Sequence, residues 1–236
     1  MVRMHWARIG YQWTWVLSFL VAACAGGGDR PATGSPAKNI PAQADLRRSV
    51  VFLGTSLTAG LGLDPTEAYA ARIQAKVDSA GLPFRVINAG VSGETSAGAL
   101  RRIDWVLSQG PVTVLVIETG ANDGLRGLSV DSLRANLDAI LTRAELVVPK
   151  PVLVVAGMEA MPNLGRSYGL PFRLLFAEVA RVHQAHYLPF LLGGVAGVDS
   201  LNQADGIHPT ARGALIVADN VWRVLGPILD SIAHRS

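Results

Sequence analysis

The chain has 236 residues, and 50% of them are hydrophobic, which is enough to bury one sizeable core. Its formal net charge of +3 falls to +1 without Arg3 and Arg8, so the charge balance excludes the electrostatic footprint of a nucleic-acid-binding protein. The single cysteine excludes a disulfide within the chain. We therefore expect one folded domain and no nucleic-acid partner.

The N-terminal segment has the features of an export signal. Arg3 and Arg8 precede an uncharged apolar segment over 13–23, which is shorter than the roughly 20 residues that span a membrane comfortably. We predict a signal peptide over 1–23. Val21-Ala22-Ala23-Cys24 resembles the lipobox of bacterial lipoproteins, which implies that the Cys24 thiol is lipidated. The alternative is an ordinary signal peptide with an incidental cysteine.

Residues 24–46 are rich in Gly, Pro, Ala and Ser, a composition typical of a flexible tether. With a lipid on Cys24, the membrane is a partner, and we expect an exported lipoprotein of the bacterial cell envelope. The folded domain is predicted over 47–236. Its oligomeric state stays open.

After the tether, apolar strand patterns alternate with amphipathic helical patterns. Unbroken apolar strands suit a parallel sheet covered on both faces, so we predict an α/β fold, a flavodoxin-like three-layer α/β/α sandwich. Ligands bind such sheets beyond the carboxyl ends of the strands. The expected strands are 49–53, 84–88, 112–117, 152–156 and 187–190, and the expected helices are 68–80, 98–109, 129–147, 171–185 and one after 209.

Ser56 follows the first predicted strand in a turn that leads toward a helix. Its hydroxyl can stand at the strand end beside a helix N-terminus, which favours a developing negative charge. A serine nucleophile needs an imidazole in reach and a carboxylate that orients the imidazole. Alternatively, Ser56 or Thr58 caps the helix while Gly54 and Gly60 form the turn.

Asp205 and His208 can supply that imidazole and carboxylate. They are three residues apart, so one helical turn or a tight loop places both side chains on the same side. The carboxylate can accept the Nδ1 hydrogen and leave Nε2 free to take the serine proton. Alternatively, Asp205 begins a turn and His208 caps the last helix.

Two further strand ends offer hydrogen-bond donors for an oxyanion. Gly90 follows the second strand and lets a backbone N–H approach a substrate, and Asn122 follows the third and has a side-chain amide. Gly and Asn are also common in ordinary turns.

Four blocks together resemble the SGNH, or GDSL-type, esterase and lipase family in order and spacing. The blocks are Gly54-Thr55-Ser56-Leu57, Gly90, Gly120-Ala121-Asn122-Asp123 and Asp205-Gly206-Ile207-His208. Within this family the chain looks like the bacterial arylesterase and multifunctional thioesterase/lysophospholipase branch, and the resemblance covers about residues 48–229.

The resemblance implies hydrolysis of an acyl ester through a covalent serine intermediate. Ser56 would be the nucleophile, His208 the general base and then acid, and Asp205 its orienter. The oxyanion donors would be the backbone amides of Ser56 and Gly90 and the side chain of Asn122. No cofactor and no metal is required. The family usually has Asp before the nucleophile, and this chain has Thr55, a departure that concerns substrate preference, since that Asp is not a triad member.

Substrate choice is less specified. The segment 158–171 is expected to wall an acyl pocket, and Met158 and Tyr168 suit an apolar chain, although they suit ordinary loop packing equally. Aryl esters, acyl thioesters, lysophospholipids and acetylated sugars all stay open.

A different class of function is a non-catalytic, surface-tethered binding module of flavodoxin-like fold. Its first turn would hold a phosphate, but the chain has no phosphate-binding glycine motif after a strand, and this alternative leaves Asp205 and His208 without a role. A tethered module with a degenerate site is a third possibility.

Overall fold

The computed structural model describes residues 47–235. The predicted signal peptide, Cys24 and the tether lie outside the described residues. The described chain contains a sheet of five parallel strands in the order β2-β1-β3-β4-β5. The strands are β1 (Arg48–Gly54), β2 (Phe84–Gly90), β3 (Val114–Ile117), β4 (Val152–Ala156) and β5 (His186–Leu188).

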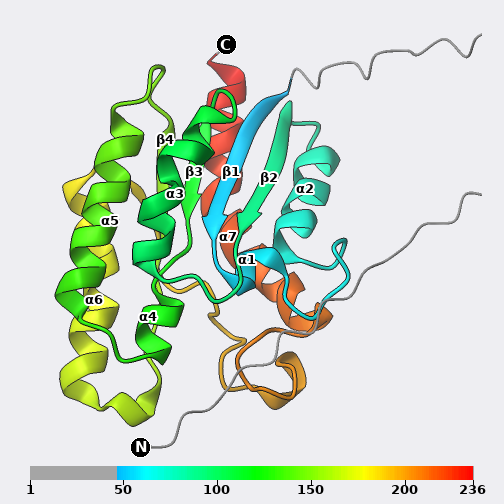
Figure 1. Cartoon of the computed structure of the whole chain (residues 1–236). Helices are drawn as coiled ribbons and strands as arrows, with labels where there is room; N and C mark the ends of the chain where they lie inside the picture. The colour runs from blue at the N-terminus through cyan, green and yellow to red at the C-terminus, as the bar shows by residue number, and fades with distance from the viewer. Residues whose placement is uncertain (1–46, 236) are drawn as a thin grey trace, which may run out of the picture. The chain divides into compact units, whose positions relative to one another are not determined.

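Helices cover both faces of this sheet. Helices α3, α5 and α6 pack in succession on one face, and α2 and α7 pack together on the other (Figure 1). The predicted three-layer α/β/α sandwich with a parallel sheet is therefore confirmed. The helices are α1 (Ser56–Ala59), α2 (Tyr69–Ser79), α3 (Ser96–Ser108), α4 (Ala121–Leu125), α5 (Val130–Glu145), α6 (Arg166–Val182) and α7 (Ala211–His234), with short 3₁₀ turns at Pro162–Leu164 and Asp199–Leu201.

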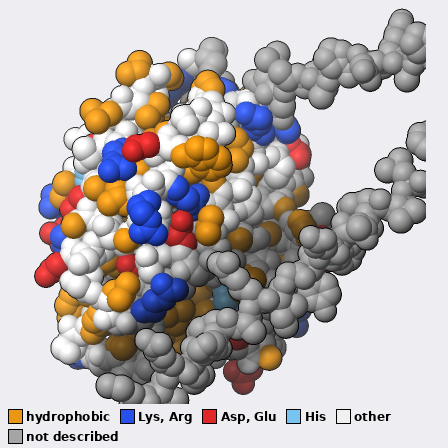
Figure 2. Space-filling model, viewed as in Figure 1, with side chains coloured by type: hydrophobic (Ala, Val, Ile, Leu, Met, Phe, Trp, Pro, Cys, Tyr) orange, Lys and Arg blue, Asp and Glu red, His pale blue; other side chains and the backbone are white. Residues whose placement is uncertain are grey.

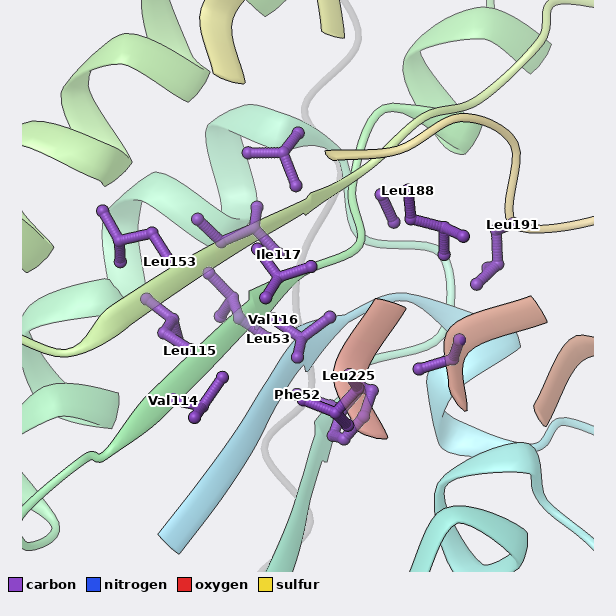
Figure 3. Close-up of a cluster of buried hydrophobic side chains, with 14 of the residues drawn as sticks. Phe52, Leu53, Val114, Leu115, Val116, Ile117, Leu153, Leu188, Leu191 and Leu225 are labelled. Carbon is purple, nitrogen blue, oxygen red and sulfur yellow. The ribbon is translucent and has the colours of Figure 1, made fainter. Parts of the chain in front are cut away.

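The core lies on both sides of the central strands. Every residue of β3 is buried, and so is each residue of β1 after Arg48. Phe52 of β1 packs edge to face on Tyr69 of α2, with ring centroids 5.7 Å apart, and lies beside Leu225 of α7 (Figure 3). Burial on two faces explains why these strands are unbroken apolar runs rather than alternating ones.

Two segments differ from the sequence-based expectation. Helix α6 begins at Arg166 and not near Pro171, which lies inside it. Proline lacks an N–H and therefore removes one helical hydrogen bond, but Phe172 and Phe176 are fully buried on the same helix, and that burial outweighs the loss. The expected loop after β3 forms the short helix α4, so Asn122 lies in a helical turn.

The face of the molecule drawn in Figure 2 has mixed charge. In Figure 2, Lys and Arg side chains are interspersed with Asp and Glu side chains among neutral and hydrophobic ones. Over residues 47–235, no helix has the length and the hydrophobicity needed to cross a membrane.

Candidate active site

Ser56, His208 and Asp205 form one continuous hydrogen-bonded relay. The Oγ atom of Ser56 lies 2.8 Å from Nε2 of His208, and Nδ1 of His208 lies 2.6 Å from Oδ2 of Asp205. With the Nδ1 hydrogen directed at the carboxylate, Nε2 is the acceptor for the serine hydroxyl. In this arrangement Nε2 of His208 can take the hydroxyl proton of Ser56 while Oγ of Ser56 attacks an acyl carbon.

Ser56 is the first residue of α1, directly after β1. The N-cap is Thr55, and its side chain makes no capping hydrogen bond. The hydroxyls of Ser56 and Thr58 instead bond His208 and Glu118, so neither of them caps the helix. The Ser56 N–H has no acceptor among residues 47–235 and is available to a substrate oxygen.

The loop before α7 holds the His208 side chain in place. Oδ1 of Asp205 accepts the backbone N–H groups of Ile207 at 2.9 Å and His208 at 3.0 Å, while Oδ2 faces the imidazole. These bonds, above all the one from the His208 backbone, lower the pKa of Asp205 to about 2. Helix α7 is capped by Thr210, whose Oγ1 accepts the N–H of Gly213, and not by His208.

Gly90 and Asn122, which are predicted as further oxyanion donors, both make hydrogen bonds to neighbouring groups. The Gly90 N–H donates to Oδ1 of Asn88 at 2.9 Å. A side chain at Gly90 would collide with the backbone of Ala59 in α1, so the close packing of β2 on α1 requires glycine there. Nδ2 of Asn122 donates one hydrogen to the Glu94 carbonyl at 2.9 Å, and its second hydrogen has no acceptor within the described chain.

A small apolar cavity of about 10 Å³ lies against Ser56 and His208. Leu57, Leu61 and Leu192 line it on the apolar side. The residues predicted for an acyl pocket lie elsewhere: Met158 is buried in the core, and the Tyr168 hydroxyl donates to the Leu128 carbonyl at 2.8 Å. A role for Met158 and Tyr168 in substrate binding stays a prediction.

An ion pair between Arg102 and Glu94, which the sequence did not predict, lies beside the site. The Nε and Nη2 atoms of Arg102 in α3 donate to the Glu94 carboxylate at 2.7 to 2.9 Å, and Nη2 also reaches the Gly54 carbonyl at 3.2 Å. The pair thus connects α3, the loop that contacts Asn122 and the residue before the nucleophile turn. Neither residue belongs to a recognisable motif, so only the fold reveals the connection.

A buried carboxylate was also missed. Glu118 follows β3, is fully buried, and accepts hydrogen bonds from Thr55 and Thr58 on either side of Ser56. Its sequence signal was a lone acid at the end of an apolar run. Among the residues that the structure describes, no group of three or more His, Cys, Asp or Glu is arranged to hold a metal ion.

Comparisons with known proteins agree with this geometry. The GDSL-like Lipase/Acylhydrolase family matches residues 52–216. The chain is 36% identical over 187 residues to Esterase TesA of Pseudomonas aeruginosa, covering 79% of this chain and 92% of TesA. It is 30% identical over 182 residues to Thioesterase 1/protease 1/lysophospholipase L1 of Escherichia coli, covering 77% of this chain and 85% of that protein.

Solved structures show the same likeness. The psychrotrophic esterase EstA from a Pseudoalteromonas species, in a structure inhibited by monoethylphosphonate, superposes with a TM-score of 0.73 and 32% identity. That match covers 78% of this chain and 99% of the EstA chain. The resemblance stated from the four sequence blocks is confirmed, and the chain belongs to the GDSL-like lipase/acylhydrolase family, with the fold of the SGNH hydrolases.

Proposed function

We propose that the protein is a serine esterase that hydrolyses short-to-medium acyl or aryl esters through an acyl-Ser56 intermediate. The observation that carries the proposal is the relay of 2.8 and 2.6 Å from Ser56 through His208 to Asp205. A non-catalytic binding module would leave this relay without a purpose. The names of the similar esterases support the same chemistry.

The relay supports a two-step reaction. In the first step Oγ of Ser56 attacks the ester carbonyl as its proton moves to Nε2 of His208, and the carbonyl oxygen becomes an oxyanion near the Ser56 N–H and the Asn122 amide. His208 then protonates the departing alcohol, leaving an ester on Ser56. In the second step His208 takes a proton from water, the hydroxide attacks the acyl carbon, and the proton returns to Ser56.

Several classes of ester fit the proposed reaction. The cavity beside Ser56 holds only about 10 Å³, roughly the space of one water molecule, so the acyl group would lie largely outside it. The printed names of the relatives include thioesterase, lysophospholipase and arylesterase, so acyl thioesters and lysophospholipids are included as candidate substrates.

A chain-length series tests the proposal. The full-length protein is assayed with p-nitrophenyl acetate, butyrate and octanoate, beside a Ser56→Ala variant and a matched Ser108→Ala variant on the exposed end of α3. Ser56→Ala should abolish hydrolysis, and Ser108→Ala should leave it unchanged. Substantial hydrolysis by folded Ser56→Ala would overturn the proposal.

We also propose that the enzyme is an exported lipoprotein that is anchored through Cys24. The support is in the sequence: an uncharged apolar segment ends in small residues directly before the single cysteine. Expression in a bacterium fed radiolabelled palmitate should label the wild-type protein and not Cys24→Ser. If neither the wild type nor Cys24→Ser is labelled, and both are recovered with the membrane in equal amounts, Cys24 is not lipidated and the N-terminal segment is an ordinary signal peptide.

A further inference from the structure

The side chain of Glu118 is fully buried behind the nucleophile turn and has no cationic partner. Its relative exposure is 0%, and no Lys, Arg or His of residues 47–235 forms an ion pair with it. An unpaired buried carboxylate is costly unless hydrogen bonds compensate for the lost hydration. The groups that donate hydrogen bonds to Glu118 therefore indicate its role.

Within residues 47–235, the hydrogen bonds to the Glu118 carboxylate come from Thr55, which precedes Ser56, and from Thr58, two residues after it. Oε2 accepts the backbone N–H of Thr55 at 2.8 Å and the hydroxyl of Thr58 at 2.8 Å. The Thr55 hydroxyl lies 3.0 Å from Oε1 and 3.1 Å from Oε2. One carboxylate therefore fixes both the entry and the third residue of the four-residue turn that presents the nucleophile.

The surrounding chain is shaped to admit this carboxylate. A side chain at Gly54 would collide with Thr58 and come within 2.8 Å of Oε2 of Glu118. Thr58 is held in turn by the Tyr69 hydroxyl of α2 at 2.6 Å. Glycine at position 54 thus leaves the space in which the Thr58 hydroxyl contacts the Glu118 carboxylate.

We propose that Glu118 is a positioning residue that holds Ser56 in register through Thr55 and Thr58, and that it does so in its ionised form. The Thr55 N–H can only donate, so it needs an oxygen that keeps its lone pairs free. Protonation would remove the negative charge that strengthens these hydrogen bonds, and the Thr55 hydroxyl would then have to accept a hydrogen from Glu118 rather than donate one. The inference rests on the proposed function of Ser56, and Glu118 itself touches neither Ser56 nor the substrate site.

Glu118 therefore changes its protonation near neutral pH. Burial raises the pKa of Glu118 to about 7, with the bonds from Thr55 and Thr58 opposing that rise. Tyr69 of α2 interacts electrostatically with Glu118. Arg102 of α3, which is paired with Glu94, contacts the Gly54 carbonyl next to Thr55, and the His208–Asp205 pair lies at Ser56.

Protonation of Glu118 should therefore weaken catalysis below neutral pH. Essential groups that titrate in the free enzyme appear in the pH profile of kcat/KM. On the acid side, the logarithm of kcat/KM should fall more steeply in the wild type than in a variant without this carboxylate, by about one per pH unit. A role of Glu118 confined to folding would leave the two slopes equal.

The test compares the full-length wild-type protein with Glu118→Gln and Glu145→Gln between pH 5 and 9, using p-nitrophenyl butyrate. Glu145 is a matched control because it also accepts hydrogen bonds, but from Lys150 and His183, away from the relay. Glu118→Gln should lower the acid slope by about one per pH unit and lower kcat at pH 8 by roughly 10- to 100-fold, with KM nearly unchanged. Glu145→Gln should keep the wild-type profile.

Equal acid slopes in the wild type and in folded Glu118→Gln, or unchanged kcat in that variant, would overturn the inference. If Glu118→Gln fails to fold, ¹³C-Glu NMR of the wild type decides the matter: the buried carboxyl must titrate over the pH range in which kcat/KM falls on its acid side, and the inference fails if it does not. Ser56→Ala separates the two proposals, because its activity reports on the nucleophile alone. An inactive Ser56→Ala beside a normal Glu118→Gln would remove only the role of Glu118.

Discussion

The Nε2 atom of His208 lies 2.8 Å from Oγ of Ser56, although the two residues are 152 positions apart in the chain. Ser56, the proposed nucleophile, comes from the turn after β1, and His208, the proposed base, comes from the loop before α7, so their contact depends on how the two loops are joined. Gln203 joins them directly: its Nε2 atom donates to the Leu61 carbonyl at 2.8 Å and to the Pro209 carbonyl at 2.9 Å.

Replacing that amide should loosen the contact between nucleophile and base. Gln203→Leu keeps the approximate size of the side chain and removes both hydrogen bonds, so kcat should fall by about tenfold, with a small change in KM. Steady-state kinetics with p-nitrophenyl butyrate measure this, with Gln109→Leu on the exposed end of α3 as the matched control. A folded Gln203→Leu enzyme with wild-type kcat would show that the loops hold their positions without the amide.

Asp205→Asn should lower kcat by about 10⁴-fold. An amide cannot both accept the Nδ1 hydrogen and keep the two backbone donors satisfied, and the imidazole then adopts the wrong tautomer. The low pKa of Asp205, about 2, means that this carboxylate stays ionised across the whole acid side of the wild-type profile. Titration of Asp205 should therefore cause no change in activity above pH 4. Asp199→Asn in the nearby 3₁₀ turn is the control, and more than a tenth of wild-type activity in Asp205→Asn would contradict the assignment.

Asn122→Ala should lower kcat by about 10² to 10³-fold with a modest change in KM, because an oxyanion donor acts mainly in the transition state. The same amide also bonds the Glu94 carbonyl, so loss of activity could follow from a displaced loop. Arg126→Ala tests that account, since Arg126 donates to the neighbouring Gly93 carbonyl at 2.9 Å. If Arg126→Ala loses as much activity as Asn122→Ala, loop position rather than the amide explains the effect.

The sheet was predictable because its strands carry a local signal. Val114–Ile117 is a run of four apolar residues, and such runs indicate strands covered on both sides. The start of α6 was not predictable in this way. Pro171 is typical of a helix start, but the burial of Phe172 and Phe176 against the rest of the fold decides where the helix lies.

The relay of Ser56, Asp205 and His208 was predictable from short motifs, since each motif contains a residue type that the chemistry requires. Glu118 and Arg102 were not, because their roles depend on which distant groups they face. Arg102 reaches the carbonyl of Gly54, 48 positions away, and no local pattern encodes that distance.

Glu118→Gln should become more stable relative to the wild type as the pH rises. The folded-state pKa of Glu118, about 7, lies above its ordinary value of 4.5. Below pH 4.5 the carboxyl is protonated in both the folded and the unfolded chain, and it contributes no difference. Between pH 4.5 and 7 the unfolded chain releases this proton first, so the wild type loses folding free energy over that range, up to about 3 kcal/mol.

Urea unfolding of both proteins at pH 4.5 and pH 8 measures this shift, because the glutamine does not titrate and the difference isolates Glu118. The free energy of unfolding of Glu118→Gln, relative to the wild type, should rise by about 3 kcal/mol between the two pH values. A variant that is slower at pH 8 and yet more resistant to urea there would show that this carboxylate is retained for catalysis at the expense of stability. A relative stability that does not change with pH would mean that Glu118 titrates alike in both states, and the pH argument for its role would then fail.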